Sequence, residues 1–311
     1  MKKFVFKIII LALLLIVLDY LGGGLLAYTV RHTNRGEFGR HNYISNIMTD
    51  DILIMGSSRA YRHYDSKVIS DSFNLSCYNC GELGNGIIYN YGIYQLLNRR
   101  YHPKIIIFDV MPNFDLLKGE ENNKYIKWFK VFYDEHLLSP IINRIDKTET
   151  IKMKSKLYRY NSLFLDVIFD YFTKDSHLER KGFDPVDEEM DTLKIDHNKK
   201  TYQFSEDYDS LKIIFIKKFV EEVTRNDTKL FFVVSPLWYG MDSTKLEPIK
   251  KICEECSIPF LDFANDSNYI HQNQFFYNPT HLNKVGANYF TKELTTKLMS
   301  HLHFEKTFSN R

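Results

Sequence analysis

Residues 51–61 read DILIMGSSRAY, an apolar run that ends abruptly in Gly-Ser-Ser. Four consecutive apolar residues at 52–55 predict a strand that is covered on both faces, as in a parallel sheet. Gly56 then permits a sharp turn, so that Ser58 lies at the carboxyl edge of the sheet, where ligands bind in open α/β folds. Taken alone, Gly-Ser-Ser could equally be an ordinary turn, so the choice between a turn and a functional serine depends on residues elsewhere in the chain.

Strands and helices alternate along most of the chain. Further apolar runs have the length of buried strands, at residues 74–78, 105–108, 230–234 and 259–263. Helices are expected between and after them, at residues 66–72, 87–97, 207–225, 245–256 and 284–301. Such alternation is typical of βαβ units, which form a parallel sheet through right-handed crossovers. The sequence therefore predicts an α/β, three-layer, flavodoxin-like fold with about five parallel strands.

The alternation stops between residues 116 and 205, after the third predicted strand. This region is rich in aromatic and charged residues, and residues 125–133 and 158–172 have helical apolar spacing. We expect a helical insertion that ends in a polar loop over residues 174–201. It could be a lid or a packing layer, or it could form a substrate groove or a docking surface for a membrane partner.

The N-terminus carries an almost wholly apolar run at residues 4–28, with lysines before and within it. At ~1.5 Å per residue this run can cross a ~30 Å hydrocarbon core. The lysines favour a cytoplasmic N-terminus, which places the rest of the chain outside a bacterial-type cell membrane. A signal peptide cleaved near the glycines at 22–24 is the alternative. We expect an anchor over residues 1–28, a tether over 29–49 and one domain over 50–305.

Charge and cysteine content narrow the possible partners. Lys and Arg number 41 against 39 Asp and Glu, so no concentrated basic patch exists for nucleic acid. The four cysteines form two C-x-x-C pairs, Cys77 with Cys80 and Cys253 with Cys256. Their distance in sequence and their placement on a strand and a helix argue against a shared metal ion. Local disulfides or free thiols are expected, and no metal or other cofactor is.

A serine needs a base before it can attack a carbonyl, and the base needs a group that orients it. His281 is the most suggestive base, in the stretch FFYNPTHLNKVGA at residues 275–287. It follows the last predicted strand and precedes the last helix, so it lies at the same sheet edge as Ser58. His63 is close to Ser58 in sequence, but we expect it to be exposed.

Together these residues resemble the SGNH, or GDSL-like, hydrolase family over about residues 51–298, less the insertion. Gly56-Ser57-Ser58 matches the family's Gly-Asp-Ser motif, with Ser57 in the acidic position. His281 falls on the histidine of the family's last motif, Asp-x-x-His, which precedes the final helix. The resemblance implies that Ser58 is the nucleophile and that His281 is its general base.

The resemblance also implies an oxyanion hole. Residues 79–84, NCGELG, match the glycine motif after the second strand, with Gly84 as the backbone donor. Asn113 matches the asparagine after the third strand, although Pro112 replaces the glycine that usually precedes it. The N–H groups of Ser58 and Gly84 and the amide of Asn113 would then stabilise the tetrahedral oxyanion.

One position departs from the family pattern. The residue three before His281 is Asn278 instead of aspartate, and an amide cannot supply the negative charge that stabilises an imidazolium. Three interpretations remain: a Ser58–His281 dyad oriented by Asn278 or a backbone carbonyl, an acid from elsewhere such as Asp262 or Asp266, or a site that binds without turnover.

An anchored, extracytoplasmic SGNH-like domain resembles the proteins that O-acetylate surface polysaccharides and the tethered protein of teichoic-acid D-alanylation. By that resemblance a membrane-bound O-acyltransferase supplies an acyl group, and this protein passes it through Ser58 to a glycan acceptor. Arg59, Trp238 and Tyr239 are candidate substrate-lining residues. The alternatives are an esterase that uses water as acceptor and a non-catalytic envelope protein that binds glycan or a membrane partner.

Overall fold

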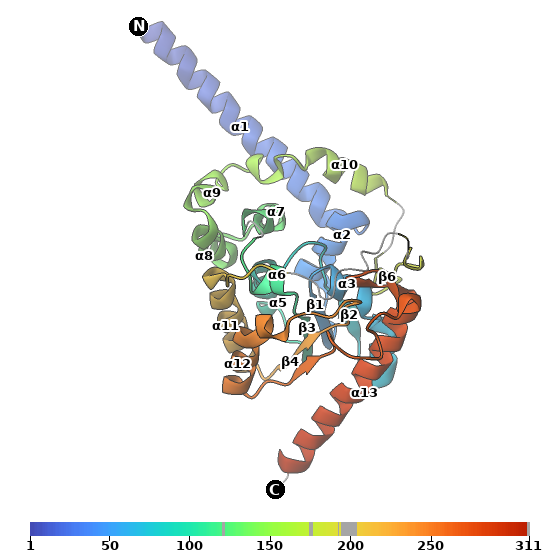
Figure 1. The fold of residues 1–311 in the computed structure, drawn as a ribbon. Helices are drawn as coiled ribbons and strands as arrows, with labels where there is room; N and C mark the ends of the chain where they lie inside the picture. The colour runs from blue at the N-terminus through green and yellow to red at the C-terminus, as the bar shows by residue number, and fades with distance from the viewer. Residues whose placement is uncertain (120–121, 174–176, 192, 194–203, 310–311) are drawn as a thin grey trace. The chain divides into compact units, whose positions relative to one another are not determined.

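A computed structural model gives the fold of residues 1–119, 122–173, 177–191, 193 and 204–309 (Figure 1). The chain forms two compact units. The N-terminal unit comprises Met1–Met48, Gly92–Arg99 and Asn122–His177. The sheet unit comprises Thr49–Tyr91, Arg100–Glu121 and Leu178–Arg311. Residues 174–176, 192 and 194–201 of the polar loop expected at 174–201 lie outside the described residues.

The sheet unit contains a five-stranded parallel sheet in the order β2-β1-β3-β4-β5. Its strands are β1 Ile52–Gly56, β2 Cys77–Asn79, β3 Ile105–Asp109, β4 Lys229–Val234 and β5 Phe260–Asp262. All residues of β1 and β3 are buried, which is why these strands read as continuous apolar runs. Gly56 pairs with Asp109 at the carboxyl ends of these two strands. The predicted α/β class and the five parallel strands are confirmed.

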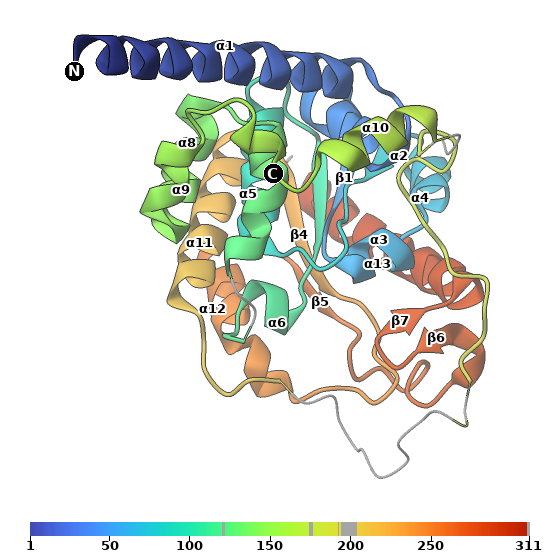
Figure 2. The ribbon, with the colours of Figure 1, turned by 90° about the horizontal axis from the view of Figure 1, so that it is seen from above.

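Helices cover both faces of this sheet (Figure 2). One face carries α3 Ser58–His63, α4 Ser66–Phe73 and α13 Lys284–Ser309, and the other carries α11 Ser210–Arg225, α12 Glu247–Cys256 and the start of α5 Ile87–Asn98. Shorter elements complete the unit: α6 Pro112–Asp115, the 3₁₀ turns Ser243–Leu246 and Asn273–Phe275, and the antiparallel pair β6 Phe276–Asn278 and β7 His281–Leu282.

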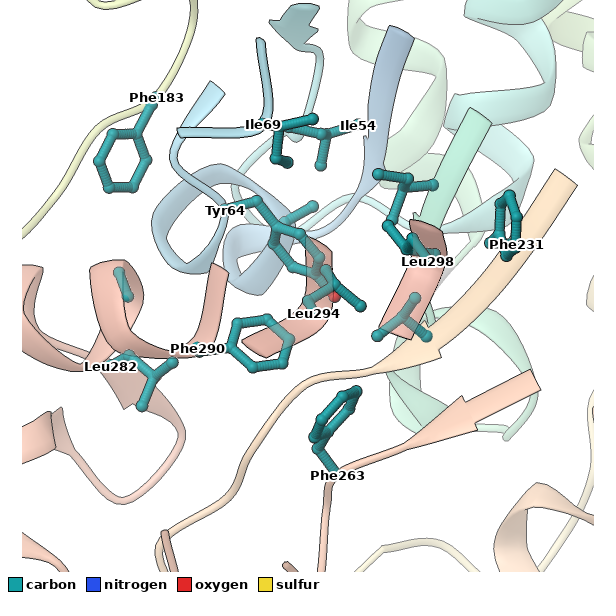
Figure 3. Close-up of a cluster of buried hydrophobic side chains, with 14 of the residues drawn as sticks. Ile54, Tyr64, Ile69, Phe183, Phe231, Phe263, Leu282, Phe290, Leu294 and Leu298 are labelled. Atoms are coloured by element: carbon teal, nitrogen blue, oxygen red, sulfur yellow. The ribbon is translucent and has the colours of Figure 1, made fainter. Parts of the chain in front are cut away.

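The core between α13 and the sheet fixes the elements that carry the candidate site (Figure 3). Phe290, Leu294 and Leu298 recur every four residues on α13 and are fully buried. The ring centroid of Phe290 lies 5.2 Å from that of Tyr64, the residue that follows α3. Leu282 belongs to the same cluster, which places its chain neighbour His281 beside a rigid core. Each such side chain contributes ~1.5–3 kcal/mol by burial.

The N-terminal unit is helical in its described part. It contains α1 Lys2–His32, α2 Gly36–Asn42, a π-helical turn Tyr43–Ile47, α7 Ile126–Val131, α8 Glu135–Ile145, α9 Lys147–Lys152, α10 Phe164–Phe172 and the 3₁₀ turns Asn122–Tyr125 and Tyr158–Tyr160. Among the described residues, α1 is the one helix long and apolar enough to cross a membrane. The helical spacing expected within the insertion thus corresponds to helices in this unit.

Three boundaries differ from the expectations. The second strand begins at Cys77 rather than at 74, because Asn74 adopts a left-handed φ of 51° that ends α4. The last helix continues to Ser309 rather than 301, since residues 302–309 contain no glycine or proline. The expected tether at 29–49 contains α2 and the π-helical turn, and its His41 is buried with its ring centroid 3.5 Å from that of Trp128.

Candidate active site

Ser58 and His281 meet at the carboxyl edge of the sheet. The Oγ of Ser58 lies 2.8 Å from Nε2 of His281, within hydrogen-bond distance. Ser58 opens α3 directly behind β1, and Gly56 makes that turn possible with a φ of 137°. A Cβ at Gly56 would come within 2.6 Å of the carbonyl oxygen of Asp109, so only glycine fits. The sequence prediction that nucleophile and base share one edge corresponds to this contact.

Asn278 orients the histidine. Its Oδ1 lies 3.1 Å from Nδ1 of His281 and also accepts the backbone N–H groups of Thr280 and His281, each at 3.0 Å. The amide oxygen cannot donate, so Nδ1 of His281 carries the proton and Nε2 presents its lone pair to the Ser58 hydroxyl. Asn278 therefore supplies the tautomer that a serine nucleophile needs, without the negative charge of an aspartate.

The surroundings of His281 disfavour its protonation. Burial, together with the positive charges of Arg62 and Arg59, lowers the pKa of His281 to about 4. The two acids considered as substitutes are engaged elsewhere: Asp262 accepts the N–H of Ala264, and Asp266 accepts an N–H within its own loop. His281 is thus a neutral base over most of the pH range, and no carboxylate among the described residues pairs with its ring.

His63 was expected to be exposed, and this was wrong: the side chain is fully buried. The backbone N–H of Leu282 donates to its Nε2 at 2.9 Å, so Nδ1 carries the proton and donates to Oγ of Ser235 at 2.8 Å. Burial, with the charge of Arg59 next, holds the pKa of His63 well below its usual range. His63, the last residue of α3, therefore links this helix to Leu282, the residue after His281.

Asp109 is the centre of a second buried group. Its carboxylate accepts Nε of Arg59 at 3.1 Å, the hydroxyl of Tyr64 at 2.5 Å and the N–H of Ser235 at 3.2 Å. The side chain of Arg59 is 1% exposed, so the prediction that it lines the substrate surface is corrected: it pairs with Asp109 inside the fold. These bonds hold the carboxyl ends of β3 and β4 against α3.

The glycine loop after β2 is held to its neighbours on both sides. The N–H of Glu82 donates to the carbonyl of Gly56, at the end of β1. A Cβ at Gly86 would collide with the backbone of Phe114 in α6. The buried side chain of Asn90 accepts the N–H of Gly56 at 3.1 Å and donates to the carbonyl of Gly86 at 2.9 Å. Gly84 lies in this loop with a φ of 67°.

Asn113 lies in α6, which buried polar groups fix in place. The ammonium of Lys212, itself fully buried, donates to the carbonyls of Asn113 and Leu117 at 2.7 Å each. Asp115 accepts the N–H of Met111 at 2.6 Å, and burial raises the pKa of Asp115 to about 7. The structure thus brings the loops of Gly84 and Asn113 into direct contact, and their role as oxyanion donors stays a prediction.

Trp238 and Tyr239 are 5% and 6% exposed and belong to the core beneath the site. The prediction that they line a substrate surface is corrected accordingly. Trp238 donates its indole N–H to Asn273 at 2.9 Å and its backbone N–H to the carbonyl of Pro279 at 3.0 Å. It therefore supports the turn that carries His281.

The cysteines are free thiols on separate elements. Cys77 and Cys80 are buried on β2 and in the loop after it, whereas Cys253 and Cys256 lie on α12. Burial raises the pKa of Cys77 well above its usual range and that of Cys253 to about 12, so both remain protonated. Neither thiol is poised as a nucleophile.

Several residues that shape the site were missed by the sequence reasoning, namely His63, Asn90, Asp109 and Lys212. Asn90, Asp109 and Lys212 share one signal: each is a polar residue in an apolar stretch or at its end, where a buried side chain needs a partner. His63 lies among polar residues and carries no such signal. The protein matches no family model, and no curated protein is significantly similar to it.

Proposed function

We propose that the protein is a membrane-anchored serine acyltransferase or esterase that works through a Ser58 acyl-enzyme. The 2.8 Å contact between Ser58 Oγ and His281 Nε2 carries this proposal. His281 takes the proton of Ser58 as Oγ attacks the carbonyl carbon of an ester. The protonated His281 then returns that proton to the leaving alkoxide, which leaves the acyl group on Oγ.

The loops around Ser58 could stabilise the negative charge that develops on the carbonyl oxygen during attack. Ser58 N–H, Gly84 N–H and the Asn113 amide are the proposed oxyanion donors, as the resemblance to SGNH hydrolases implies. The loops of Gly84 and Asn113 touch each other through Gly86 and Phe114, and buried polar groups hold both. Donors fixed before the reaction lower the barrier most effectively.

The low basicity of His281 bears on the rate. A base with a pKa near the working pH is most effective, and a pKa of about 4 gives a weaker driving force for proton removal. We therefore propose a slow enzyme whose site remains active well into the acidic range. The second candidate function, binding of an acylated glycan without turnover, is favoured by the same observation and by the neutral Asn278.

Contacts within the N-terminal unit favour a retained anchor over a cleaved signal peptide. Asp19, inside α1, accepts the hydroxyl of Ser155 at 2.5 Å and the N–H groups of Lys156 and Leu157 at 2.9 and 3.0 Å. Gly23 packs so closely on Lys156 that a Cβ would overlap it. Gly22 and Gly23 thus have a packing role, and cleavage beside them would remove a built interface.

Anchoring favours acyl transfer over hydrolysis. A tethered domain meets a membrane-embedded acyl donor at high effective concentration, which a secreted esterase does not need. The donor would come from a membrane-bound O-acyltransferase, and the acceptor would be the hydroxyl of an exported or cell-surface glycan. The lysines at the start of α1 support an arrangement with the N-terminus in the cytoplasm and the sheet unit outside it.

The test uses the purified full chain in detergent with p-nitrophenyl acetate. The proposal predicts release of p-nitrophenol by the wild-type protein and its loss in Ser58→Ala and His281→Ala. A matched control, Ser57→Ala, removes a neighbouring hydroxyl that is fully buried and should leave most activity. Added oligosaccharide acceptors distinguish transfer from hydrolysis by the mass of the product. Equal rates in wild type and Ser58→Ala would leave only the binding function.

A further inference from the structure

The helix α10, Phe164–Phe172, presents a continuous apolar face to the outside. Its exposed residues are Phe164, Leu165, Ile168, Phe169 and Phe172, which are 44% to 72% exposed. At 100° per residue they cover an arc of roughly 140° of the helix surface. Leu163 and Val167 face the interior instead and are 5% and 1% exposed. We call the five exposed residues the α10 face.

This face cannot turn inward, because the opposite side of α10 is fastened to α2. Asp170 accepts the backbone N–H of Phe38 at 2.8 Å. Gly36 has a φ of 58°, and a Cβ there would overlap the Asp170 carboxylate. Large apolar surfaces that stay exposed in this way mark interaction sites.

The helix α10 lies beside the second half of α1 (Figures 1 and 2). Phe164 and Leu26 line a common hollow on this side of the unit. The loop at 155–157 packs on α1 from Asp19 to Gly23, so residues 2–18 are the part of α1 that projects freely. Their length is about 25 Å, close to the ~30 Å of a bilayer's hydrocarbon core.

Residues typical of the membrane–water interface lie where α1 meets the rest of its unit. The ammonium of Lys156 lies 3.4 Å from the ring centroid of Tyr20. Tyrosines and lysines concentrate at the headgroup level of membrane proteins. The bilayer surface is thus expected between Asp19 and Leu26, which is where α10 begins its course along α1.

We propose that α10 is an interfacial helix, whose apolar face lies in the headgroup and acyl boundary of the bilayer that α1 spans. Phe164 of this face lines the same hollow as Leu26 of α1, and this closeness to the apolar helix α1 points to lipid as the occupant of the α10 face. The proposal rests on α1 as a retained anchor and does not depend on the chemistry of Ser58. A second contact with the membrane would stop the N-terminal unit from rotating freely about α1.

The test places tryptophan reporters in the full chain reconstituted into vesicles of phosphatidylcholine and phosphatidylglycerol. Phe169→Trp reports on the α10 face, Leu14→Trp on α1, and Ile214→Trp, a partly exposed position on α11, is the control. Quenching by phosphatidylcholine brominated on its acyl chains is measured over the background of Trp128 and Trp238. Circular dichroism verifies that each variant is folded.

We expect the added fluorescence of Phe169→Trp to be quenched at least twofold by brominated lipid, and Leu14→Trp more strongly. Ile214→Trp should match the wild-type background. Quenching of Leu14→Trp without quenching of Phe169→Trp would overturn the inference while leaving the anchor in place, and would assign the α10 face to a protein partner. Absence of quenching at both positions would remove the anchor and the interfacial helix together.

Discussion

The backbone N–H of Leu282 donates to Nε2 of His63 at 2.9 Å, and this bond joins the two halves of the candidate site. His63 ends the short helix that Ser58 begins, and Leu282 directly follows His281. The distance between Ser58 and His281 thus depends on a buried histidine whose ring nitrogens bond to Ser235 and Leu282 instead of to either of these side chains. His63 acts as a positioning residue.

Replacing His63 tests this role. His63→Leu leaves the N–H of Leu282 and the hydroxyl of Ser235 without their partner, which costs ~1–3 kcal/mol of stability per buried group. We expect kcat for ester hydrolysis to fall ~10- to 100-fold with KM nearly unchanged, because a misplacement near 1 Å has effects of this size. His63→Gln offers an oxygen to the same N–H and should recover much of the loss. Equal kcat in the two variants would argue against positioning.

The second test places an acid at position 278, beside His281. Asn278→Asp keeps an oxygen near Nδ1 of His281 and adds a negative charge within ~4 Å. An opposite charge at that distance raises the pKa of a histidine by ~1–3 units. We expect kcat to rise ~10- to 100-fold, measured with p-nitrophenyl acetate. Asn278→Ala, which removes the orienting oxygen, should instead lose activity. A slower Asn278→Asp protein would indicate that the site is not built for general-base catalysis.

The pH dependence follows from the lowered pKa of His281. The base must be neutral to accept a proton, and a pKa of about 4 keeps it neutral far below the usual 6.5. As pH falls, kcat/KM should stay constant to about 5 and then drop tenfold per unit below about 4. Asn278→Asp should move this midpoint upward. A midpoint near pH 6.5 for the wild-type protein would show either that the pKa of His281 is not lowered or that His281 is not the base.

Asp109 supplies a stability prediction. Asp109→Asn leaves the buried guanidinium of Arg59 without its counter-charge, and breaking such a pair costs ~3–5 kcal/mol. The matched control is Glu221→Gln, which breaks a pair with Arg225 whose side chains are both 66% exposed. The control should cost less than ~1 kcal/mol. Urea unfolding followed by fluorescence measures the free energy of unfolding of both variants. Similar losses of stability in the two variants would contradict the larger contribution assigned to the buried pair.

Strand positions could be predicted because burial on both faces leaves a direct mark in the sequence. The runs at 52–55 and 105–108 became β1 and β3, and each ends at the residue that turns the chain toward the site. Ser58 and His281 could be placed at one edge because Ser58 directly follows β1 and His281 lies in the segment between β5 and α13. Topology alone was sufficient for that inference.

Side-chain burial around the site could not be predicted in the same way. Arg59 and His63 lie on a six-residue helix whose environment is set by α13, more than 200 positions later in the chain. A charged residue is exposed by default, and the distant Asp109 supplies the counter-charge that makes burial of Arg59 favourable. Trp238 and Tyr239 could have faced sugar or core, because aromatic residues suit both environments.

The central claim is that Ser58 is a nucleophile activated by His281, and covalent labelling tests it most directly. The full chain is treated with a fluorophosphonate probe at neutral pH, and the modified peptide is identified by mass spectrometry. The account predicts one adduct on the peptide that contains Ser58, absent in Ser58→Ala and at least tenfold slower to form in His281→Ala. A folded wild-type protein with no adduct on Ser58 would contradict it.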